Sequence, residues 1–329
     1  MTGPKLTVAV PAAGRGTRLE PITLKHSKAV TPVLGVPILK RVIDGFREIG
    51  LEDFVVVKAP DDAEIDDLCL KLEREGCRIK TAVQEKRLGT AHALLQARDL
   101  IETDFVLCSC DNLFSESHLR NLVAWHMEHR PPAVITLEPL VPEKLTSRAA
   151  VRLDGSLIVE IKEKPGDEKP ADGKSEWDAL AKFLFTFDRR LLDYLDRIEP
   201  SPRGEFEVQS ALDLLMRDSD APARGLLADN CLHLTSEQDL VDIHKHYLDK
   251  HRPFGIHENA RVKPDAVISE PVMIEEGARI GAGAIIGPYV YVGKNAVIGN
   301  GARVENAVLY PGARVEPGTT VHNRILTDD

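Results

Sequence analysis

The sequence reads IHENARVKPDAVISEPVMIEEGARIGAGAIIGPYVYVGKNAVIGNGARV from Ile256 to Val304, and every sixth residue of this stretch is apolar. The apolar series is Ile256, Val262, Ile268, Ile274, Ile280, Ile286, Val292, Ile298 and Val304. A second series, four residues further on in each unit, is small or β-branched: Ala260, Ala266, Val272, Ala278, Ala284, Val290, Ala296 and Ala302. Such a repeat predicts a left-handed parallel β-helix, in which the apolar residue fills the interior and the small residue permits the corner. A β-sandwich would not hold a six-residue phase over so many units.

The repeat continues with one irregularity. Its spacing slips to five residues after Val304 and resumes through Val315 and Val321, which gives about four turns of about 18 residues each. Ahead of the repeat, HRPFG at residues 251–255 supplies the Pro and Gly expected at a boundary. Because 329 residues exceed the usual size of one domain, we expect an N-terminal domain over 1–250 and the β-helix over 251–329.

Residues 1–250 alternate between short apolar runs and stretches of helical length. The runs suit buried parallel strands and are Leu6–Val10, Phe54–Val57, Ile79–Val83, Phe105–Cys108 and Val134–Leu137. Between the first two, the segment from Ile38 to Ile49 places its apolar residues on one helical face. The alternation predicts a doubly wound α/β sheet. Ligands then bind at the carboxyl ends of the strands.

The composition excludes several classes of protein. With 43% hydrophobic and 29% charged residues the chain is ordinary globular protein, and no apolar run reaches the ~18 residues of a membrane helix. A net charge of −10 argues against a nucleic-acid partner. The five cysteines form no CxxC pair, so we expect reduced core thiols rather than a zinc site. The start MTGPKLTV lacks the pattern of a signal peptide, and we expect the protein in the cytoplasm, away from membranes.

A glycine-rich loop follows the first predicted strand. It is VAVPAAGRGTR, Val8 to Arg18, and its Gly14, Gly16 and Thr17 leave backbone N–H groups free to face an anion. No GKS or GKT follows, so the loop is not that of a P-loop ATPase. The third glycine of GxGxxG is Leu19 here, so a dinucleotide-binding fingerprint is excluded as well.

The loop resembles the opening signature of the sugar nucleotidyltransferases, in which AAG or AGG is followed by xGTR and later by a lysine. The matching residues are Ala12, Ala13, Gly14, Gly16, Thr17, Arg18 and Lys28. Further motifs follow in the family's order: Gln84 with LGTAHAL (Leu88–Leu94), Asp111 with Asn112 after a strand, IKEKP (Ile161–Pro165) and RGEFEVQSALDLLM (Arg203–Met216). Five motifs in the right order over about 250 residues make coincidence improbable.

The resemblance implies a mixed sheet, a reaction and a set of roles. A sugar 1-phosphate attacks the α-phosphorus of a nucleoside triphosphate, UTP or dTTP being favoured, and pyrophosphate leaves without a general base. Arg18 would hold the departing phosphates, Lys28 the α-phosphate, and Asp111 a Mg²⁺ ion. The implied nucleotide-binding residues are Ala12, Ala13, Gly14, Gly16, Thr17, Arg18, Lys28, Gln84, Gly89 and Thr90. Those implied for the sugar phosphate are Asn112, Glu163 and Lys164.

The chain departs from the family pattern on the sugar side. A second metal-binding Asp of the family falls on His233, a poor Mg²⁺ ligand, and Asp229 would replace it only if the loop shifts. Ala149 stands where the family has a glycine. Ala181, Lys182 and Phe183 stand where the family has Asn-x-Gly. These changes leave open an unusual acceptor or a weakly active, regulatory paralogue.

The β-helix raises a further alternative, because hexapeptide coils also occur in acyltransferases. His257 and His322 lie at the two ends of the repeat, where exposed caps are the expectation. Here the hexads contain no long insertion. We therefore interpret the coil as an assembly or regulatory module and expect a homo-oligomer formed through it.

Overall fold

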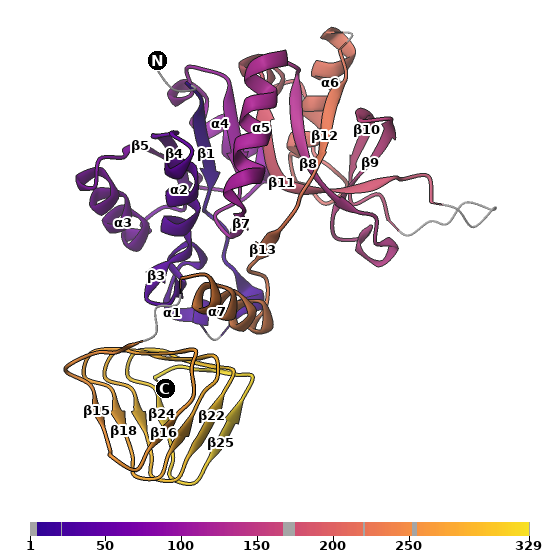
Figure 1. The fold of residues 1–329 in the computed structure, drawn as a ribbon. Coiled ribbons are helices and arrows are strands. Elements are labelled where there is room, and N and C mark those ends of the chain that lie inside the picture. Colours follow the sequence, from indigo (N-terminus) through magenta and orange to yellow (C-terminus); the bar gives the residue numbers. More distant parts are fainter. Residues whose placement is uncertain (1–4, 21, 167–174, 220, 252–254, 329) are drawn as a thin grey trace. The chain divides into compact units, whose positions relative to one another are not determined.

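Two compact units make up the chain in the computed structural model, which describes residues 5–20, 22–166, 175–219, 221–251 and 255–328 (Figure 1). The first unit comprises residues 1–15, 27–30 and 39–231, and the second comprises residues 16–26, 31–38 and 232–329. The second unit thus includes residues 16–26, 31–38 and 232–250 of the segment 1–250. The division of the chain at residue 250 stays a prediction about its functional domains.

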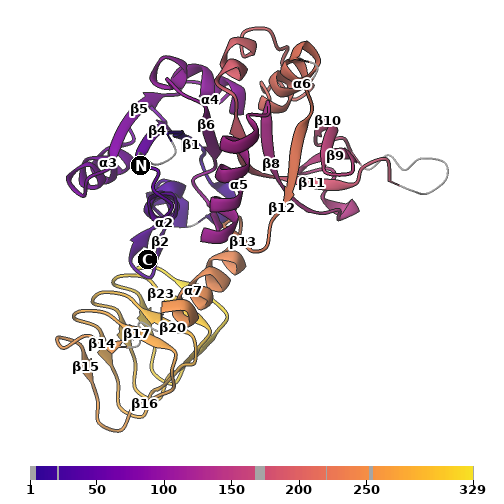
Figure 2. The ribbon, with the colours of Figure 1, turned by 45° about the horizontal axis from the view of Figure 1, so that its top comes forward.

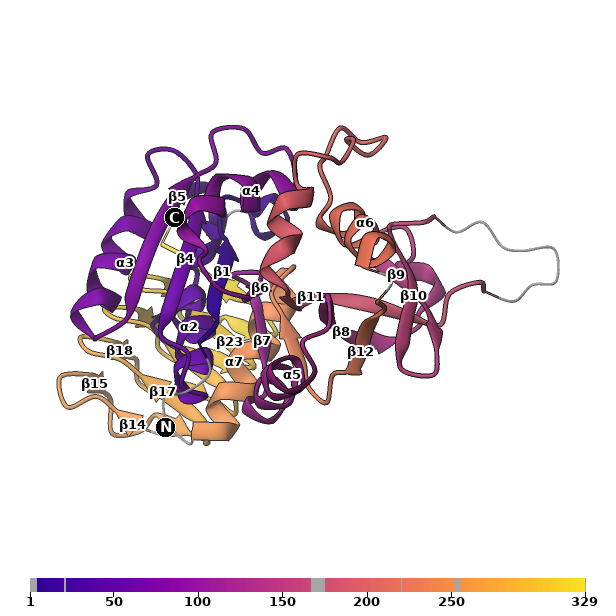
Figure 3. The same cartoon turned by 90° about the horizontal axis from the view of Figure 1, so that it is seen from above.

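A mixed sheet of nine strands forms the first unit, in the order β5-β4-β1-β6-β11-β8-β12-β10-β9. Its strands are β1 (Thr7–Pro11), β4 (Asp53–Lys58), β5 (Arg78–Val83), β6 (Phe105–Cys108), β8 (Ala133–Pro139), β9 (Ala149–Asp154), β10 (Leu157–Glu163), β11 (Ala179–Phe187) and β12 (Ala223–Leu227). All five predicted strands form, within a few residues of their expected ends. β1, β4, β5 and β6 pair in parallel, whereas β11 runs antiparallel between β6 and β8. β9 and β10 lie at the end of the sheet away from β5 (Figure 3). The predicted fold class is confirmed.

Helices cover both faces of this sheet because the buried strands alternate their side chains between two cores. The α-helices of the unit, with α2 starting at its border, are α2 (Ile38–Glu48), α3 (Ala63–Arg74), α4 (Thr90–Ala97), α5 (Glu116–His129) and α6 (Val208–Ser219). Its short helical turns are η2 (Lys28–Val30), η3 (Arg98–Leu100), η4 (Pro142–Lys144) and η5 (Arg189–Tyr194). Ala9, Val55 and Val57 share one core with α4 and α6. The alternate residues of β1 and β4, such as Val8 and Val56, are buried outside that cluster.

The second unit is built on a left-handed β-helix of three parallel sheets (Figure 2). The strands of the coil are β14 (Gly255–Ile256), β15 (Arg261–Val262), β16 (Val267–Ile268), β17 (Val272–Ile274), β18 (Arg279–Ile280), β19 (Ile285–Ile286), β20 (Val290–Val292), β21 (Val297–Ile298), β22 (Arg303–Glu305), β23 (Ala307–Leu309), β24 (Arg314–Val315), β25 (Thr320–His322) and β26 (Ile325–Leu326). Ile256 pairs with Ile274, one turn of 18 residues away. Later Val290 pairs with Ala307, which reflects the slip in spacing after Val304.

The predicted interior series is buried from Ile274 through Val304, each residue at 2% exposure or less. In the first turn, by contrast, Ile256 is 50% exposed because no earlier turn of the coil covers it. The remaining elements of this unit are η1 (Thr17–Leu19), α1 (Ile22–Lys25), the hairpin strands β2 (Pro32–Val33) and β3 (Val36–Pro37), and α7 (Glu237–His251). Strand β7 (Asn112–Phe114) belongs to the first unit, and β13 (Cys231–His233) spans the border between the units. Among the described residues, no helix combines the length and the apolarity that a membrane crossing requires.

Candidate active site

Two predicted catalytic residues meet in the first unit. Asp111 follows strand β6, whose fully apolar FVLC ends at Cys108, and Lys28 opens the short helix η2. Lys28 Nζ donates to Asp111 Oδ2 in a close ion pair. The side chains are only 15% and 11% exposed, so solvent screens the pair weakly. A cation and an acid therefore lie together beyond the carboxyl end of a central strand, where this class of sheet binds its ligands.

The start of the phosphate loop is held by two hydrogen bonds within the first unit. Ala12 N donates to Val57 O of β4 at 2.7 Å, and Arg87 Nε donates to Ala13 O at 2.5 Å. A Cβ at Gly14 would meet no atom within 4 Å, so this stretch of backbone is open. Arg87 is a candidate phosphate ligand that the sequence reasoning missed. Its only signal was a basic residue immediately before the LGT motif.

The rest of that loop lies in the other unit. Gly16, Thr17 and Arg18 are part of the segment 16–26 of the second unit. Gly16 has a φ of +68° and precedes the short helix η1, as a glycine at a tight turn requires. The roles of these three residues on the triphosphate stay predictions.

The loop with Leu88, Gly89 and Thr90, called the LGT loop here, packs against the segment before α6. Gly89 has a φ of +101°, and a Cβ there would lie 2.5 Å from Phe206 O. The Thr90 hydroxyl accepts from Val208 N at 3.2 Å. Gln84 Nε2 donates to Gly89 O at 3.1 Å, and the side chain is 5% exposed. The predicted nucleotide-binding residues Gln84, Gly89 and Thr90 therefore lie together, and Thr90 supports the backbone of the segment before α6.

An acidic cluster lies where the sugar is expected. Glu163, at the end of β10, accepts from Gln209 Nε2 of α6 at 2.9 Å. Arg203 Nη2 lies 2.6 Å from Glu207 Oε1 and 3.9 Å from Glu163 Oε1. Burial raises the pKa of the Glu163 carboxyl, and the nearby charge of Glu207 raises it further. Lys164 Nζ lies 3.6 Å from Glu163 Oε1.

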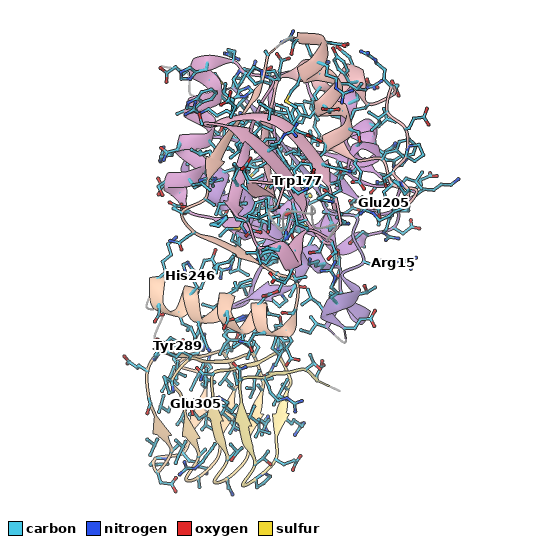
Figure 4. All side chains as sticks on the ribbon, turned by 90° about the vertical axis from the view of Figure 1, so that its right-hand side faces the viewer. Arg15, Trp177, Glu205, His246, Tyr289 and Glu305 are labelled. Atoms are coloured by element: carbon cyan, nitrogen blue, oxygen red, sulfur yellow. The ribbon has the colours of Figure 1, made fainter. Side chains whose placement is uncertain are left out.

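Three of these residues border a hollow of about 1120 Å³ between β10, the loop before α6 and α6 itself. Glu163, Glu207 and Gln209 line it. Glu205, labelled in Figure 4, precedes Glu207 on the loop before α6. The sequence analysis listed the segment Arg203–Met216 among the family motifs but singled out none of its side chains. Carboxylate and amide oxygens accept hydrogen bonds from sugar hydroxyls, so Glu207 and Gln209 join the candidate site.

A metal ion at this site would have one protein carboxylate as a ligand rather than a full set of protein ligands. Among the described residues, no group of three or more His, Cys, Asp or Glu side chains is arranged to hold a metal. Asp229 accepts from the hydroxyls of Ser115 and Ser117 at 2.7 Å each, which ties it to the start of α5. Mg²⁺ commonly uses one or two carboxylates together with substrate phosphates. Asp111 fits that mode.

Three further residues that the sequence analysis singled out are His233, Lys182 and Phe183. His233 lies in the second unit, with its Nδ1 3.1 Å from Thr235 Oγ1, and its part in metal binding stays a prediction. Lys182 Nζ forms an ion pair with Glu138 Oε2 at 2.9 Å. Phe183 stands edge-on to Phe185, with ring centroids 5.5 Å apart. A bulky aromatic side chain, Phe183, thus stands where the family pattern has a glycine, and Lys182, at the unspecified position of Asn-x-Gly, is ion-paired.

Comparison with known proteins supports the resemblance over most of the chain. The family described as Nucleotidyl transferase matches residues 10–249. The chain belongs to the nucleotidyl transferase family. The family described as GMPPB C-terminal domain matches residues 268–329. Membership confirms the family expected from the loop and the four later motifs.

Individual relatives match part of the chain. UTP--glucose-1-phosphate uridylyltransferase AglF of Haloferax volcanii is 33% identical over 217 residues, 64% of this chain and 84% of that protein. Glucose-1-phosphate thymidylyltransferase of Streptomyces griseus is 31% identical over 62% of this chain and 56% of its own length. The bifunctional protein GlmU of Methanocaldococcus jannaschii is 25% identical over 78% of this chain. The chain spans only 59% of that protein.

Solved structures agree on the fold. A UDP-glucose pyrophosphorylase complexed with UDP-glucose superposes with a TM-score of 0.64 at 19% identity, over 74% of this chain and 99% of its own. A putative glucose-1-phosphate thymidylyltransferase from Bacillus anthracis gives the same TM-score and identity, over 74% and 96%. The matched part of this chain therefore has the fold of these proteins.

Proposed function

We propose that this chain joins a nucleoside triphosphate to a sugar 1-phosphate, giving a nucleotide sugar and pyrophosphate. The observation that carries the proposal is the Lys28–Asp111 ion pair at the end of β6, within a chain of the nucleotidyl transferase family. UTP or dTTP is the favoured nucleotide, in agreement with the names of the relatives AglF and the thymidylyltransferase.

Lys28 acts on the α-phosphate. Its ammonium is paired with the Asp111 carboxylate, which offsets the cost of keeping either charge away from water. An incoming triphosphate offers the ammonium stronger anionic oxygens, so Lys28 exchanges its carboxylate partner for the α-phosphate. There it stabilises the negative charge that develops as the sugar phosphate attacks. Arg18 and Arg87 are assigned to the leaving phosphates.

Asp111 then becomes available to a Mg²⁺ ion. A bound Mg²⁺ would neutralise phosphate charge and align the two substrates. Asp111 is its protein ligand in this proposal, with Asn112 beside it. Gln84 and the Gly89 loop receive the base, and Glu163, Glu207 and Lys164 receive the sugar and its phosphate.

In this proposal the chain assembles into a homo-oligomer through its β-helix. The half-exposed Ile256 and the exposed Val267 leave an apolar end on the first turn, and burial of such an end against a second copy supports a homo-oligomer. His257 and His322 are exposed at the two ends of the repeat, which gives no support to acyl transfer. The cytoplasm stays the expected compartment.

The test is pyrophosphate release by the purified chain with Mg²⁺, each nucleoside triphosphate in turn and a panel of sugar 1-phosphates. Release with one substrate pair, abolished in Asp111→Asn, supports the proposal and identifies both substrates. If no pair releases pyrophosphate, although the chain is folded and still binds a nucleotide, the regulatory paralogue is favoured instead. The bulky Phe183 and the Lys182–Glu138 ion pair point to that alternative.

A further inference from the structure

A side chain of helix α3 holds the backbone just ahead of the proposed catalytic lysine. Ser27 N donates to Glu64 Oε2 at 2.9 Å, and Ser27 immediately precedes helix η2, which begins at Lys28. Val30 N donates back to Ser27 O at 3.0 Å and closes this short turn. A hydrogen bond to a carboxylate is stronger than one between neutral groups. The start of η2 is therefore fixed by a residue that lies 37 positions further along the chain.

This contact lies wholly within the first unit, which contains residues 27–30 and 39–231. Ala29, in the middle of η2, is fully buried. The bond between Ser27 and Glu64 is partly buried, and low access of water strengthens a hydrogen bond. Helix η2 is thus a fixed part of this unit.

Helix α3 is itself anchored at the turn that carries Glu64. Asp62 caps the helix by accepting from Ile65 N at 3.2 Å, and Ile65 is fully buried. Lys58, the last residue of β4, donates through Nζ to Asp66 Oδ2 at 2.7 Å. The first turn of α3 is thereby tied to the sheet, and Glu64 extends from a well-held backbone.

Lys28 is held at both ends. Its backbone follows the anchored Ser27, and its ammonium group is paired with the Asp111 carboxylate. When the ammonium group exchanges Asp111 for the α-phosphate, as the proposed function requires, the bond from Ser27 N remains in place. Because lysine has a flexible four-carbon stem, the position of its backbone sets the region that the ammonium group can reach. An error of about 1 Å in catalytic geometry costs on the order of 100-fold in rate.

We infer that Glu64 is a positioning residue, which holds Ser27 N and thereby keeps Lys28 in register with the α-phosphate. The inference rests on the proposed function for the role of Lys28. Glu64 acts through its reach, because its carboxylate spans from α3 to the Ser27 N–H. A purely structural role would predict a loss of stability without a selective effect on Lys28.

The test separates the reach of Glu64 from its charge. Glu64→Gln keeps an oxygen that can accept from Ser27 N but removes the charge. Glu64→Asp keeps the charge at the start of α3 but shortens the side chain by one methylene group, and Glu64→Ala removes both features. Asp67→Ala is the matched control, because Asp67 is an exposed carboxylate on the same helix, three residues further on.

Two readouts are taken on the full chain, after thermal unfolding has shown that each variant is folded. The first is kcat and KM for the nucleotide. The second is the rate at which a soluble N-hydroxysuccinimide ester acylates Lys28, followed by mass spectrometry. Acylation requires no turnover, so it reports on the placement of the ammonium group even in an inactive chain.

We expect Glu64→Asp and Glu64→Ala to lower kcat about tenfold with little change in KM. Both should also speed acylation of Lys28, because a displaced ammonium group pairs less well with Asp111. Glu64→Gln and Asp67→Ala should stay close to the wild type in both readouts.

A Glu64→Gln variant with a kcat as low as that of Glu64→Asp would overturn the inference, because charge rather than reach would then matter. Equal effects of Glu64→Ala and Asp67→Ala, or unchanged acylation of Lys28 in both Glu64→Asp and Glu64→Ala, would overturn it as well. A wild-type chain that is inactive with every substrate pair, yet whose Lys28 acylation responds to Glu64→Asp and not to Asp67→Ala, would count against the proposed function and support the positioning.

Discussion

Replacing Gly89 with alanine is expected to destabilise the first unit and abolish activity. The φ of +101° and ψ of −178° at Gly89 lie in a region that essentially only glycine occupies. An added Cβ would lie 2.5 Å from Phe206 O and 2.8 Å from Phe206 N. Both are backbone atoms, so neither can rotate away, and the LGT loop has to separate from the segment before α6.

The magnitude follows from what this separation breaks. Ala91 N donates to Phe206 O at 2.9 Å, and Phe206 N donates to Leu88 O at 2.7 Å. Each lost hydrogen bond costs about 1 kcal/mol, and a non-glycine residue in this backbone region costs about 1 to 3 kcal/mol. The total of about 3 to 5 kcal/mol corresponds to a fall in Tm on the order of 10 °C for a unit of this size.

Thermal and urea unfolding of the purified variants measure this change. Gly14→Ala is the control, because Gly14 also lies in a predicted nucleotide loop but a Cβ there meets no atom within 4 Å. It should unfold as the wild type does. A Gly89→Ala variant with the same Tm as Gly14→Ala would refute the argument that the Gly89 backbone must touch Phe206.

Three further outcomes are expected. Lys28→Met should lower kcat by about 100-fold to 1,000-fold, and an unchanged kcat would remove Lys28 from the mechanism. Chelation of divalent cations should stop turnover until Mg²⁺ is restored, and Asp111→Asn should remain inactive at any Mg²⁺ concentration; full recovery of the variant would contradict the assignment of Asp111. A hydrogen bond from His126, followed by smaller contributions, lowers the pKa of Asp104 to about 2 from its ordinary value of 3.8. A lowered carboxyl pKa stabilises the fold above the ordinary value and ceases to do so as the pH falls toward 2, so Asp104→Asn should cost about 2 kcal/mol at pH 7. In urea unfolding this cost should shrink between pH 5 and pH 2, and a cost independent of pH would contradict the ion pairing of Asp104.

Local patterns predicted the elements of both units well. The six-residue phase predicted the coil and even its slip, because every turn of a β-helix repeats the same inward position. The buried run FVLC predicted β6 to the residue. Strands β9, β10, β11 and β12 were missed. In β9 and β10, sequences such as RLD and VEIKE mix charged residues with apolar ones. Their pairing partners, rather than their own hydrophobicity, make them strands.

The sequence by itself determined the class of the fold, the family and the identity of the candidate site residues, because periodicity and motif spacing are properties of neighbouring residues. Tertiary structure alone decided which of those residues meet. Lys28 and Asp111 are 83 positions apart, and Tyr310 reaches Pro32 across 278. Nothing in local spacing specifies such contacts. They arise because the packing of the sheet, and separately of the coil, brings distant segments together.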